Sequence, residues 1–210
     1  QKGHEVCVIA PNEFPEFLQW MPQSESVHMD SLEPEFCRSA VEHAGFIFCL
    51  DFNQSSRIKS LQESLDKSKA YKALIDHHIE PSPDFDFTYS VTTETPSTCE
   101  LVYNFIAYCM GDKSKITVEM AQCLYVGITT DTGSLSYSCD NPSTYHVVGQ
   151  LIGKGIHGEA IHRKVYDTYS ESRMRLLGFC LSERMVVLEG YATSYIFLSK
   201  EDLERFHYKQ

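Results

Sequence analysis

The sequence predicts an α/β protein with a parallel sheet flanked by helices, a helical second half, and the start of a second, smaller α/β domain. Three observations predict this fold class. Short continuous apolar runs alternate with helical patterns over residues 6–76, which is typical of parallel strands covered on both faces. Over residues 97–184, apolar side chains recur at helical spacing. After residue 184, two short apolar runs flank Glu189-Gly190, which indicates a hairpin.

Three strands and two helices are expected in the first half of the chain. Strands are predicted over residues 6–10, 46–50 and 73–75, because each range is a continuous apolar run. Residues 33–43 form a helical pattern that ends before a glycine. A second helix is predicted over residues 56–65, where apolar side chains repeat three and four residues apart.

Five helices are expected in the second half of the chain. Helical periodicity places them over residues 97–106, 117–130, 142–152, 158–166 and 170–184. The first begins with the pattern Ser-Thr-Cys-Glu, so Ser97 and Glu100 are interpreted as a capping box. The last is long and charged, and we expect it to connect two domains.

The domain boundary is expected at the end of this connector helix. Residues 1–182 are predicted to form one domain and residues 183–210 to begin a second. The chain opens on Gln-Lys-Gly, the pattern of a helix end, directly before the first strand. We therefore expect this chain to be a fragment of a longer protein.

The composition is that of an acidic globular protein. The 210 residues include 18 basic and 29 acidic side chains, which gives a formal net charge of −11. Binding to duplex DNA depends on neutralising many phosphates, so this balance disfavours it. A surplus of carboxylates suits a site for metal cations, although an ordinary soluble surface is an equally common explanation. No apolar run reaches the roughly 20 residues of a membrane span, so no membrane partner is expected.

The cysteine pattern favours a reducing compartment. The chain has 8 cysteines, with no C-x-x-C pair and no regular spacing. A disulfide framework or a zinc ribbon would have a tighter pattern. We therefore predict a cytoplasmic protein.

Acidic residues and histidines follow two of the predicted strands. Asp51 follows the second strand, and Asp76-His77-His78 follows the third. Ligands of open parallel sheets bind at the carboxyl ends of the strands. Asp131 lies at the end of an apolar helix, where a carboxylate is unfavourable unless a cation compensates it. An aspartate after a strand is also a common turn residue, but two carboxylates and an imidazole together suit Mn²⁺, or else Mg²⁺ or Fe²⁺.

These three segments resemble the motifs of a known superfamily. Residues 50–53 (Leu-Asp-Phe-Asn), 75–78 (Ile-Asp-His-His) and 130–133 (Thr-Asp-Thr-Gly) are similar, in this order, to the second, third and fourth motifs of the DHH phosphoesterases. The segments at residues 97–103 and 170–173, with Arg57, are similar to the branch of bacterial oligoribonucleases and pAp-phosphatases, which is often labelled exopolyphosphatase-related. The superfamily's first motif is absent from this chain, and its C-terminal DHHA1-type substrate domain is represented only by its first strands.

The resemblance implies a role for each site residue. Asp51 would bridge two divalent ions, and His77 and Asp131 would complete the coordination of one of them. Asp76 would orient a histidine, and His78 would face the scissile phosphate as a catalytic and substrate-binding residue. Apart from these implied roles, we expect Arg57 to contact either a substrate phosphate or the carboxylate cluster, and a solvent-exposed arginine at a helix start is an equal alternative. The reaction implied is two-metal hydrolysis.

The implied function is a manganese-dependent phosphoesterase that acts on short oligonucleotides, on 3′-phosphoadenosine 5′-phosphate (pAp), or on both. Exopolyphosphatase, pyrophosphatase and cyclic-dinucleotide phosphodiesterase are alternatives, because the metal site is common to all of them. An alternative of another class is a noncatalytic nucleotide-binding module. Without the first motif, this polypeptide alone is expected to be inactive. A homodimer is expected at the level of the family.

Overall fold

The computed structural model describes residues 3–90, 95–111 and 113–208. The chain divides into two compact units, residues 1–165 (unit 1) and residues 166–210 (unit 2). The predicted boundary between residues 182 and 183 concerns the domains of the complete protein and stays a prediction. The predicted helix end at residues 1–3 falls largely on residues 1 and 2, which lie outside the described residues.

Unit 1 contains two parallel sheets. Strands β1 (Val8–Ala10) and β2 (Val27–Met29) form the smaller one. The larger one has the order β3-β4-β5, with β3 at Phe46–Leu50, β4 at Tyr71–Asp76 and β5 at Phe87–Ser90. This arrangement confirms the predicted parallel sheet. The sequence analysis missed β2 and β5, which are only 3 and 4 residues long and pair as additional strands beside predicted ones.

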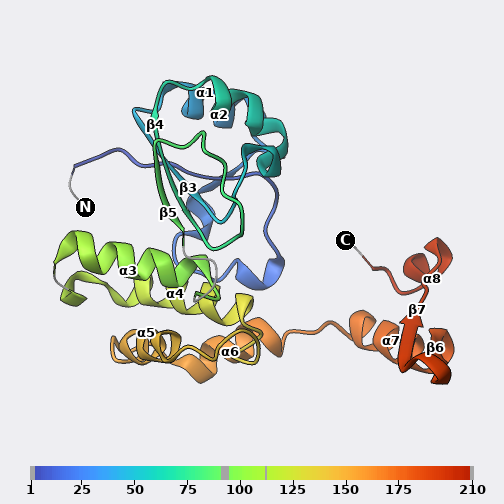
Figure 1. The fold of residues 1–210 in the computed structure, drawn as a ribbon. Coiled ribbons are helices and arrows are strands. Elements are labelled where there is room, and N and C mark those ends of the chain that lie inside the picture. The colour runs from blue at the N-terminus through green and yellow to red at the C-terminus, as the bar shows by residue number, and fades with distance from the viewer. Residues whose placement is uncertain (1–2, 91–94, 112, 209–210) are drawn as a thin grey trace. The chain divides into compact units, whose positions relative to one another are not determined.

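Helices cover the larger sheet on both faces. Val41 of α1 (Pro34–His43) and Leu65 of α2 (Gln62–Lys67) pack with Cys49 and Leu74 in one core cluster. On the opposite face, the ring of Phe48 meets that of Phe105 of α3 (Thr98–Met110) edge to face, with centroids 5.8 Å apart. Figure 1 shows α1 and α2 on one side of the strands and α3 with α4 on the other.

Strand β3 combines a free outer edge with exposed aromatic side chains among the described residues. Within residues 3–90, 95–111 and 113–208, β4 is the one strand that pairs with β3. Phe46 and Phe48 point to the α3 side and are each 50% exposed. Their rings lie 4.8 Å apart, so they form a small aromatic patch beside an unpaired strand edge.

The helix predicted over residues 56–65 is broken in the structure. A 3₁₀ helix, η3 (Ser55–Leu61), precedes α2, and Lys59 inside η3 has the non-helical angles φ 52° and ψ −114°. Two tertiary contacts hold this break: Lys59 Nζ donates to Asn12 Oδ1 at 3.1 Å, and the Ser60 hydroxyl donates to the buried carboxylate of Asp30. Long-range hydrogen bonds therefore outweigh the helical periodicity here.

The remaining helices of unit 1 agree closely with the prediction. They are α4 (Val118–Asp131), α5 (Pro142–Ile152) and α6 (Gly158–Tyr166), with α6 ending one residue beyond the unit. Short 3₁₀ helices lie at η1 (Glu16–Leu18), η2 (Ser24–Ser26) and η4 (Lys113–Lys115). Helix α4 contacts both α3 and α5, so these three helices pack as a group.

Unit 2 consists of a helix, a hairpin and a second helix. Helix α7 (Glu171–Phe179) continues into a π-helical turn, η5 (Cys180–Arg184). Strands β6 (Met185–Leu188) and β7 (Thr193–Ile196) form the predicted hairpin around the 3₁₀ turn η6 (Glu189–Tyr191). Ser199 and Asp202 form a capping box at the start of α8 (Lys200–Arg205).

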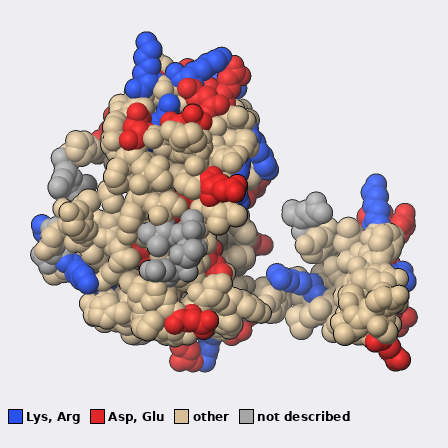
Figure 2. All heavy atoms as spheres, viewed as in Figure 1, with Lys and Arg blue, Asp and Glu red and all other residues tan. Residues whose placement is uncertain are grey.

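Three further features concern the cysteines, the helices and the surface charge of the described chain. All eight cysteines have free thiols. Among the described residues, no helix combines the length and the apolar composition needed to cross a membrane. On the face drawn in Figure 2, basic and acidic side chains are mixed over α1 and α2 and form no continuous basic stripe.

Candidate metal centre

The parallel register of β3 and β4 brings the predicted site residues to one edge of the sheet. Leu50 lies opposite Ile75, so the residues that follow the two strands emerge together. The backbone N–H of Asp51 donates to the carbonyl of Ile75 at 3.2 Å, which ties the end of β3 to β4. Asp51 itself has φ 66°, a left-handed conformation that aspartate tolerates better than most residues.

Asp51, His77 and His78 form a cluster that could hold a metal ion. One ligand atom from each of them lies within 4.8 Å of the other two. Nε2 of His77 is 3.7 Å from Oδ1 of Asp51, and the two imidazole rings are 4.8 Å apart at 69°. The structure therefore brings together Asp51 and His77, two of the three residues predicted as metal ligands, and adds His78 to them.

Asp76 is completely buried and holds His78. Its Oδ1 accepts from Nδ1 of His78 at 2.7 Å, and its Oδ2 accepts from the backbone N–H of His78 at 3.1 Å. Because an ionised carboxylate only accepts, the ring proton sits on Nδ1. Nε2 of a neutral His78 is then left with a free lone pair for a ligand in the cluster. The predicted orienting role of Asp76 has a geometric basis in these two bonds.

Asp131 is linked to the cluster by electrostatics. It is the last residue of α4, and its side chain is not part of the group of close ligand atoms among the described residues. Loss of hydration raises the pKa of its carboxyl, a hydrogen bond with Ser97 lowers it, the charge of Asp51 raises it, and His77 and His78 lower it. The pKa of Asp131 therefore depends on all three cluster residues. Crowded carboxylates of this kind are stabilised when a cation lies between them.

The N-terminal turn of α3 (residues 97–100) lies against the carboxylates. Oγ1 of Thr98 donates to Oδ1 of Asp51 at 2.7 Å. Burial, together with the charges of Asp131 and Asp51, raises the pKa of Cys99 to about 12. Cys99 is not part of the group of close ligand atoms among the described residues.

Glu100 does not complete the capping box that the sequence predicts. The Ser97 hydroxyl accepts from the N–H of Cys99, and the Glu100 carboxylate turns to α5 instead. It accepts from the hydroxyls of Ser143 and Thr144, at 2.7 Å from Thr144. The N-terminus of α5 offers a carboxylate both hydroxyls and a favourable helix dipole, which explains why the long-range partners prevail.

Arg57, predicted to contact a substrate phosphate, lies on η3 and is exposed. Among the described residues, no hydrogen bond or ion pair joins its guanidinium to the cluster. Its predicted role stays a prediction.

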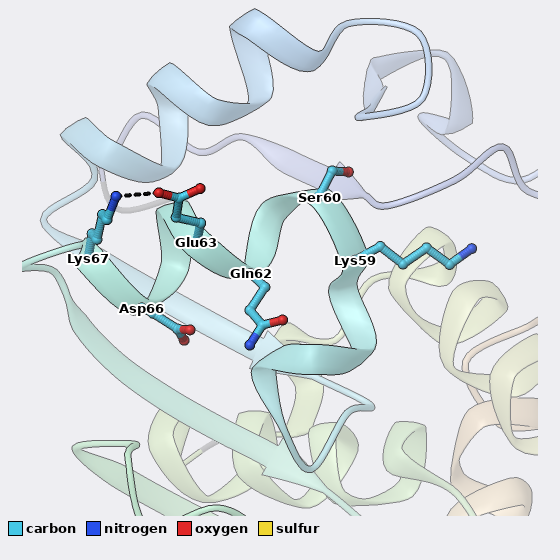
Figure 3. A pocket seen from close by; sticks show the side chains of 6 residues that line it. All are labelled: Lys59, Ser60, Gln62, Glu63, Asp66 and Lys67. Atoms are coloured by element: carbon cyan, nitrogen blue, oxygen red, sulfur yellow. Dashed lines mark hydrogen bonds and ion pairs between the residues drawn. The ribbon is translucent and has the colours of Figure 1, made fainter.

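Two hollows of unit 1 lie away from the cluster residues. One, of about 560 Å³, is lined by side chains of η3 and α2, namely Lys59, Ser60, Gln62, Glu63, Asp66 and Lys67. Figure 3 shows its two lysines at opposite ends, with Lys67 paired to Glu63. The second, of about 520 Å³, lies at the start of α6 around His157 and Arg163. Neither contains Asp51, His77 or His78, and the mixed charges of the first are unlike a phosphate site.

The N-terminal turn of α3 is the part of the site that the sequence analysis missed. Residues 97–103 resemble the oligoribonuclease branch and Ser97 is predicted as a cap, but neither observation predicts the hydroxyl contact to Asp51, which spans 47 residues along the chain. The sequence does contain an indication of this contact. Two hydroxyl residues stand at a helix start between the motif segments at residues 75–78 and 130–133.

Comparisons with known proteins place these residues in a family. Residues 4–128 match the model of the DHH family, N-terminal domain. The chain is 26% identical over 132 residues to the bifunctional oligoribonuclease and PAP phosphatase NrnA of Bacillus subtilis (strain 168), and 26% identical over 133 residues to the probable NrnA of Streptococcus mutans. Each alignment covers 63% of this chain and 41% of the relative. The chain thus spans about two fifths of these curated relatives.

A solved structure is similar over nearly the whole chain. It is the crystal structure of an exopolyphosphatase-related protein from Bacteroides fragilis, with a TM-score of 0.92 and 41% identity. The match covers 98% of this chain and 59% of that one.

Proposed function

This chain belongs to the DHH family, and from that premise we propose that the protein containing it is a metal-dependent phosphoesterase. Its proposed substrates are short oligonucleotides, pAp, or both. The observation that carries the proposal is the cluster of Asp51, His77 and His78 at the carboxyl edge of the parallel sheet, inside the matched region. The names of the two curated relatives, an oligoribonuclease and PAP phosphatase in each case, support this substrate class.

The donor set of the cluster suits a divalent ion. Carboxylate oxygens and imidazole nitrogens are ligands of Mn²⁺, and the cluster contains no thiol among the described residues. We propose that Asp51, His77 and Asp131 hold manganese, with Mg²⁺ or Fe²⁺ as alternatives and two ions in the complete protein. When bound, such ions supply positive charge that stabilises the phosphoryl oxygens.

The chain's own residues bind and orient the substrate in this proposal. The two bonds from His78 to buried Asp76 fix the imidazole, and toward the scissile phosphate His78 would act as a donor through Nε2–H, with the Asp76 carboxylate compensating the charge of the ring. Arg57 would contact a second substrate phosphate from η3. The net charge of −11 makes duplex DNA a poor partner.

Polyphosphate is a second candidate substrate. The exopolyphosphatase-related neighbour shares 41% identity with this chain, more than the curated relatives do. The same cluster suits either substrate, because both reactions cleave bonds at phosphorus. We also propose that residues 183–210 begin the substrate domain, and that the complete protein is a cytoplasmic homodimer.

An activity panel on the complete protein with Mn²⁺ tests the proposal. We expect release of mononucleotides from di- to pentanucleotides, or of phosphate from pAp, and loss of more than about 100-fold in rate for His77→Ala, since even outer partners of metal ligands cost 10–100-fold. His146→Ala, which changes an exposed histidine of α5, is the matched control. Full activity of His77→Ala would remove the cluster from the reaction, and activity on polyphosphate alone would favour the second candidate. The 210-residue chain by itself is expected to be inactive.

A further inference from the structure

The N-terminal turn of α3 lies beside both carboxylates of the proposed metal site. Ser97 is fully buried, its hydroxyl accepts from the N–H of Cys99, and its side chain lowers the pKa of Asp131. Thr98, the next residue, donates from Oγ1 to Oδ1 of Asp51 at 2.7 Å. Two adjacent hydroxyls of one helix start thus reach two carboxylates that come from a strand end and from another helix.

Asp51 has few other contacts that could fix its side chain. It lies beyond the end of β3 in a left-handed conformation, and its side chain is 53% exposed. An exposed aspartate samples several rotamers, and a hydrogen bond to a charged group favours one of them. The oxygen that accepts from Thr98 is Oδ1, the same atom that lies 3.7 Å from Nε2 of His77. The Thr98 bond therefore sets the orientation of the carboxylate relative to His77.

The turn that carries Thr98 is itself held rigidly. Glu100, in the same turn, is 0% exposed and accepts from the hydroxyls of Ser143 and Thr144 at the start of α5. Cys99 packs so closely on α4 that a Cβ atom at Gly127 would come within 2.1 Å of its sulfur. Contacts with two neighbouring helices fix the position from which the Thr98 hydroxyl donates.

We propose that Thr98 is a positioning residue, whose hydroxyl holds the Asp51 carboxylate in the orientation that binds a divalent ion together with His77. This inference rests on the proposed metal-dependent function. Thr98 does not touch the ion; it acts through Asp51. Removing its hydroxyl while keeping its shape should weaken metal binding without altering the fold, because the side chain is nearly fully buried and valine fills the same volume.

Mn²⁺ binding to the 210-residue chain tests the inference without an activity assay. Mn²⁺ is added to wild type, Thr98→Val, Thr98→Ser and Thr88→Val, and paramagnetic broadening of the His77 and His78 ring signals reports binding. We expect about 10-fold weaker binding for Thr98→Val, from the loss of a hydrogen bond to a charged group. Thr98→Ser keeps the hydroxyl and should bind within about twofold of wild type. Thr88→Val, on exposed β5, should bind like wild type.

A second readout requires no metal. Three-bond couplings that report χ1 of Asp51 should show one rotamer in wild type and in Thr98→Ser, and averaging in Thr98→Val. If Thr98→Val keeps a single rotamer, or binds Mn²⁺ as tightly as wild type, the positioning role is wrong. If wild type binds no Mn²⁺ while its Asp51 rotamer still depends on Thr98, the residues of this chain do not hold the ion by themselves, and the orienting contact stands. Far-UV circular dichroism verifies that each variant is folded.

Discussion

At the scale of single residues, a charged side chain is expected to contribute most to stability where a partner binds both oxygens of a carboxylate. Both carboxylate oxygens of Asp76 accept hydrogen bonds from His78. Both oxygens of Asp202 likewise accept from Arg184, whose Nε and Nη2 donate at 2.9 and 2.8 Å. The exposed pairs along the helices, such as Lys200 with Glu204 at 3.7 Å, have no such geometry. Bidentate, partly buried pairs are the ones expected to affect stability.

The Arg184–Asp202 pair predicts a pH dependence for unit 2. Hydrogen bonds from Arg184, then from the backbone of Ser199, lower the pKa of Asp202 to about 2. Because the folded pKa lies below the unfolded value of about 3.9, the stabilisation is complete above pH 4 and is lost as the pH falls toward 2. Urea unfolding, followed by the ring signals of Phe179 and Phe206, measures it.

Two variants separate this pair from the rest of unit 2. Asp202→Asn should lower stability at neutral pH and flatten the dependence between pH 4 and 2. Glu204→Gln, which changes an exposed pair, should do neither. An unchanged slope in Asp202→Asn would show that other carboxyls control the acid transition.

Sequence reasoning located some of these residues and not others, for a physical reason. Asp51 and Asp76 could be found because the carboxyl ends of parallel strands meet at one edge, so sequence alone predicts their proximity. The partners of Thr98 and Glu100 could not be predicted, because they lie 47, 43 and 44 residues away along the chain, and for Glu100 a local capping box was the simpler interpretation. Hydroxyl–carboxylate contacts carry no periodic signal in a sequence.

At the scale of elements, the close approach of α3 and α4 brings Ser97 to Asp131. Gly127 is the point of contact, since a Cβ atom there would meet Sγ and Cβ of Cys99 at 2.1 and 2.9 Å. Gly127 lies one helical turn before Asp131, so the spacing of the two helices determines where the carboxylate stands. The boundaries of these helices were predictable from periodicity and caps, whereas their spacing depends on packing. The break in the η3–α2 segment could likewise not be predicted from periodicity, because it is stabilised by hydrogen bonds to Asn12 and Asp30, which lie far away in the sequence.

Alanine at Gly127 should therefore destabilise unit 1. Alanine favours helix by about 1 kcal/mol over glycine, but overpacking against Cys99 should cost about 1–3 kcal/mol. Gly149→Ala is the matched control, because Gly149 also lies within a helix and nothing is within 4 Å of its added Cβ. We expect chemical denaturation to show a loss for Gly127→Ala and a gain of about 0.5–1 kcal/mol for Gly149→Ala. Equal gains in both variants would contradict the close packing of α3 on α4.

At the scale of the whole molecule, the candidate site belongs to one unit alone. Asp51, His77, His78 and Asp131 all lie in residues 1–165, and unit 2 contributes none of them. The α/β class and the parallel sheet followed from the alternation of strands and helices, and the structure confirms them. The short strands β2 and β5 carry too few residues for a pattern of their own.

Metal addition should therefore stabilise unit 1 selectively. A ligand that binds only the folded state adds about 2.7 kcal/mol at 100 times its dissociation constant. Hydrogen exchange with mass spectrometry should show slower exchange in β3, β4 and the start of α3 when Mn²⁺ is present, with β6 and β7 unchanged. EDTA should reverse the effect, and His77→Ala should abolish it. Equal protection of β6 and β7 would argue against a site confined to unit 1.

Among the described residues no strand pairs with the outer edge of β3, which has a practical consequence for work with this chain. Its N–H and C=O groups, beside two half-exposed phenylalanines, form a ready template on which strands of other copies can add. Concentrated samples of the isolated polypeptide are thus prone to aggregate through this edge. A lysine in place of Phe46 would be a rational first choice for improving solubility, since charge on an edge strand opposes such pairing while the residues of the candidate metal centre are left intact.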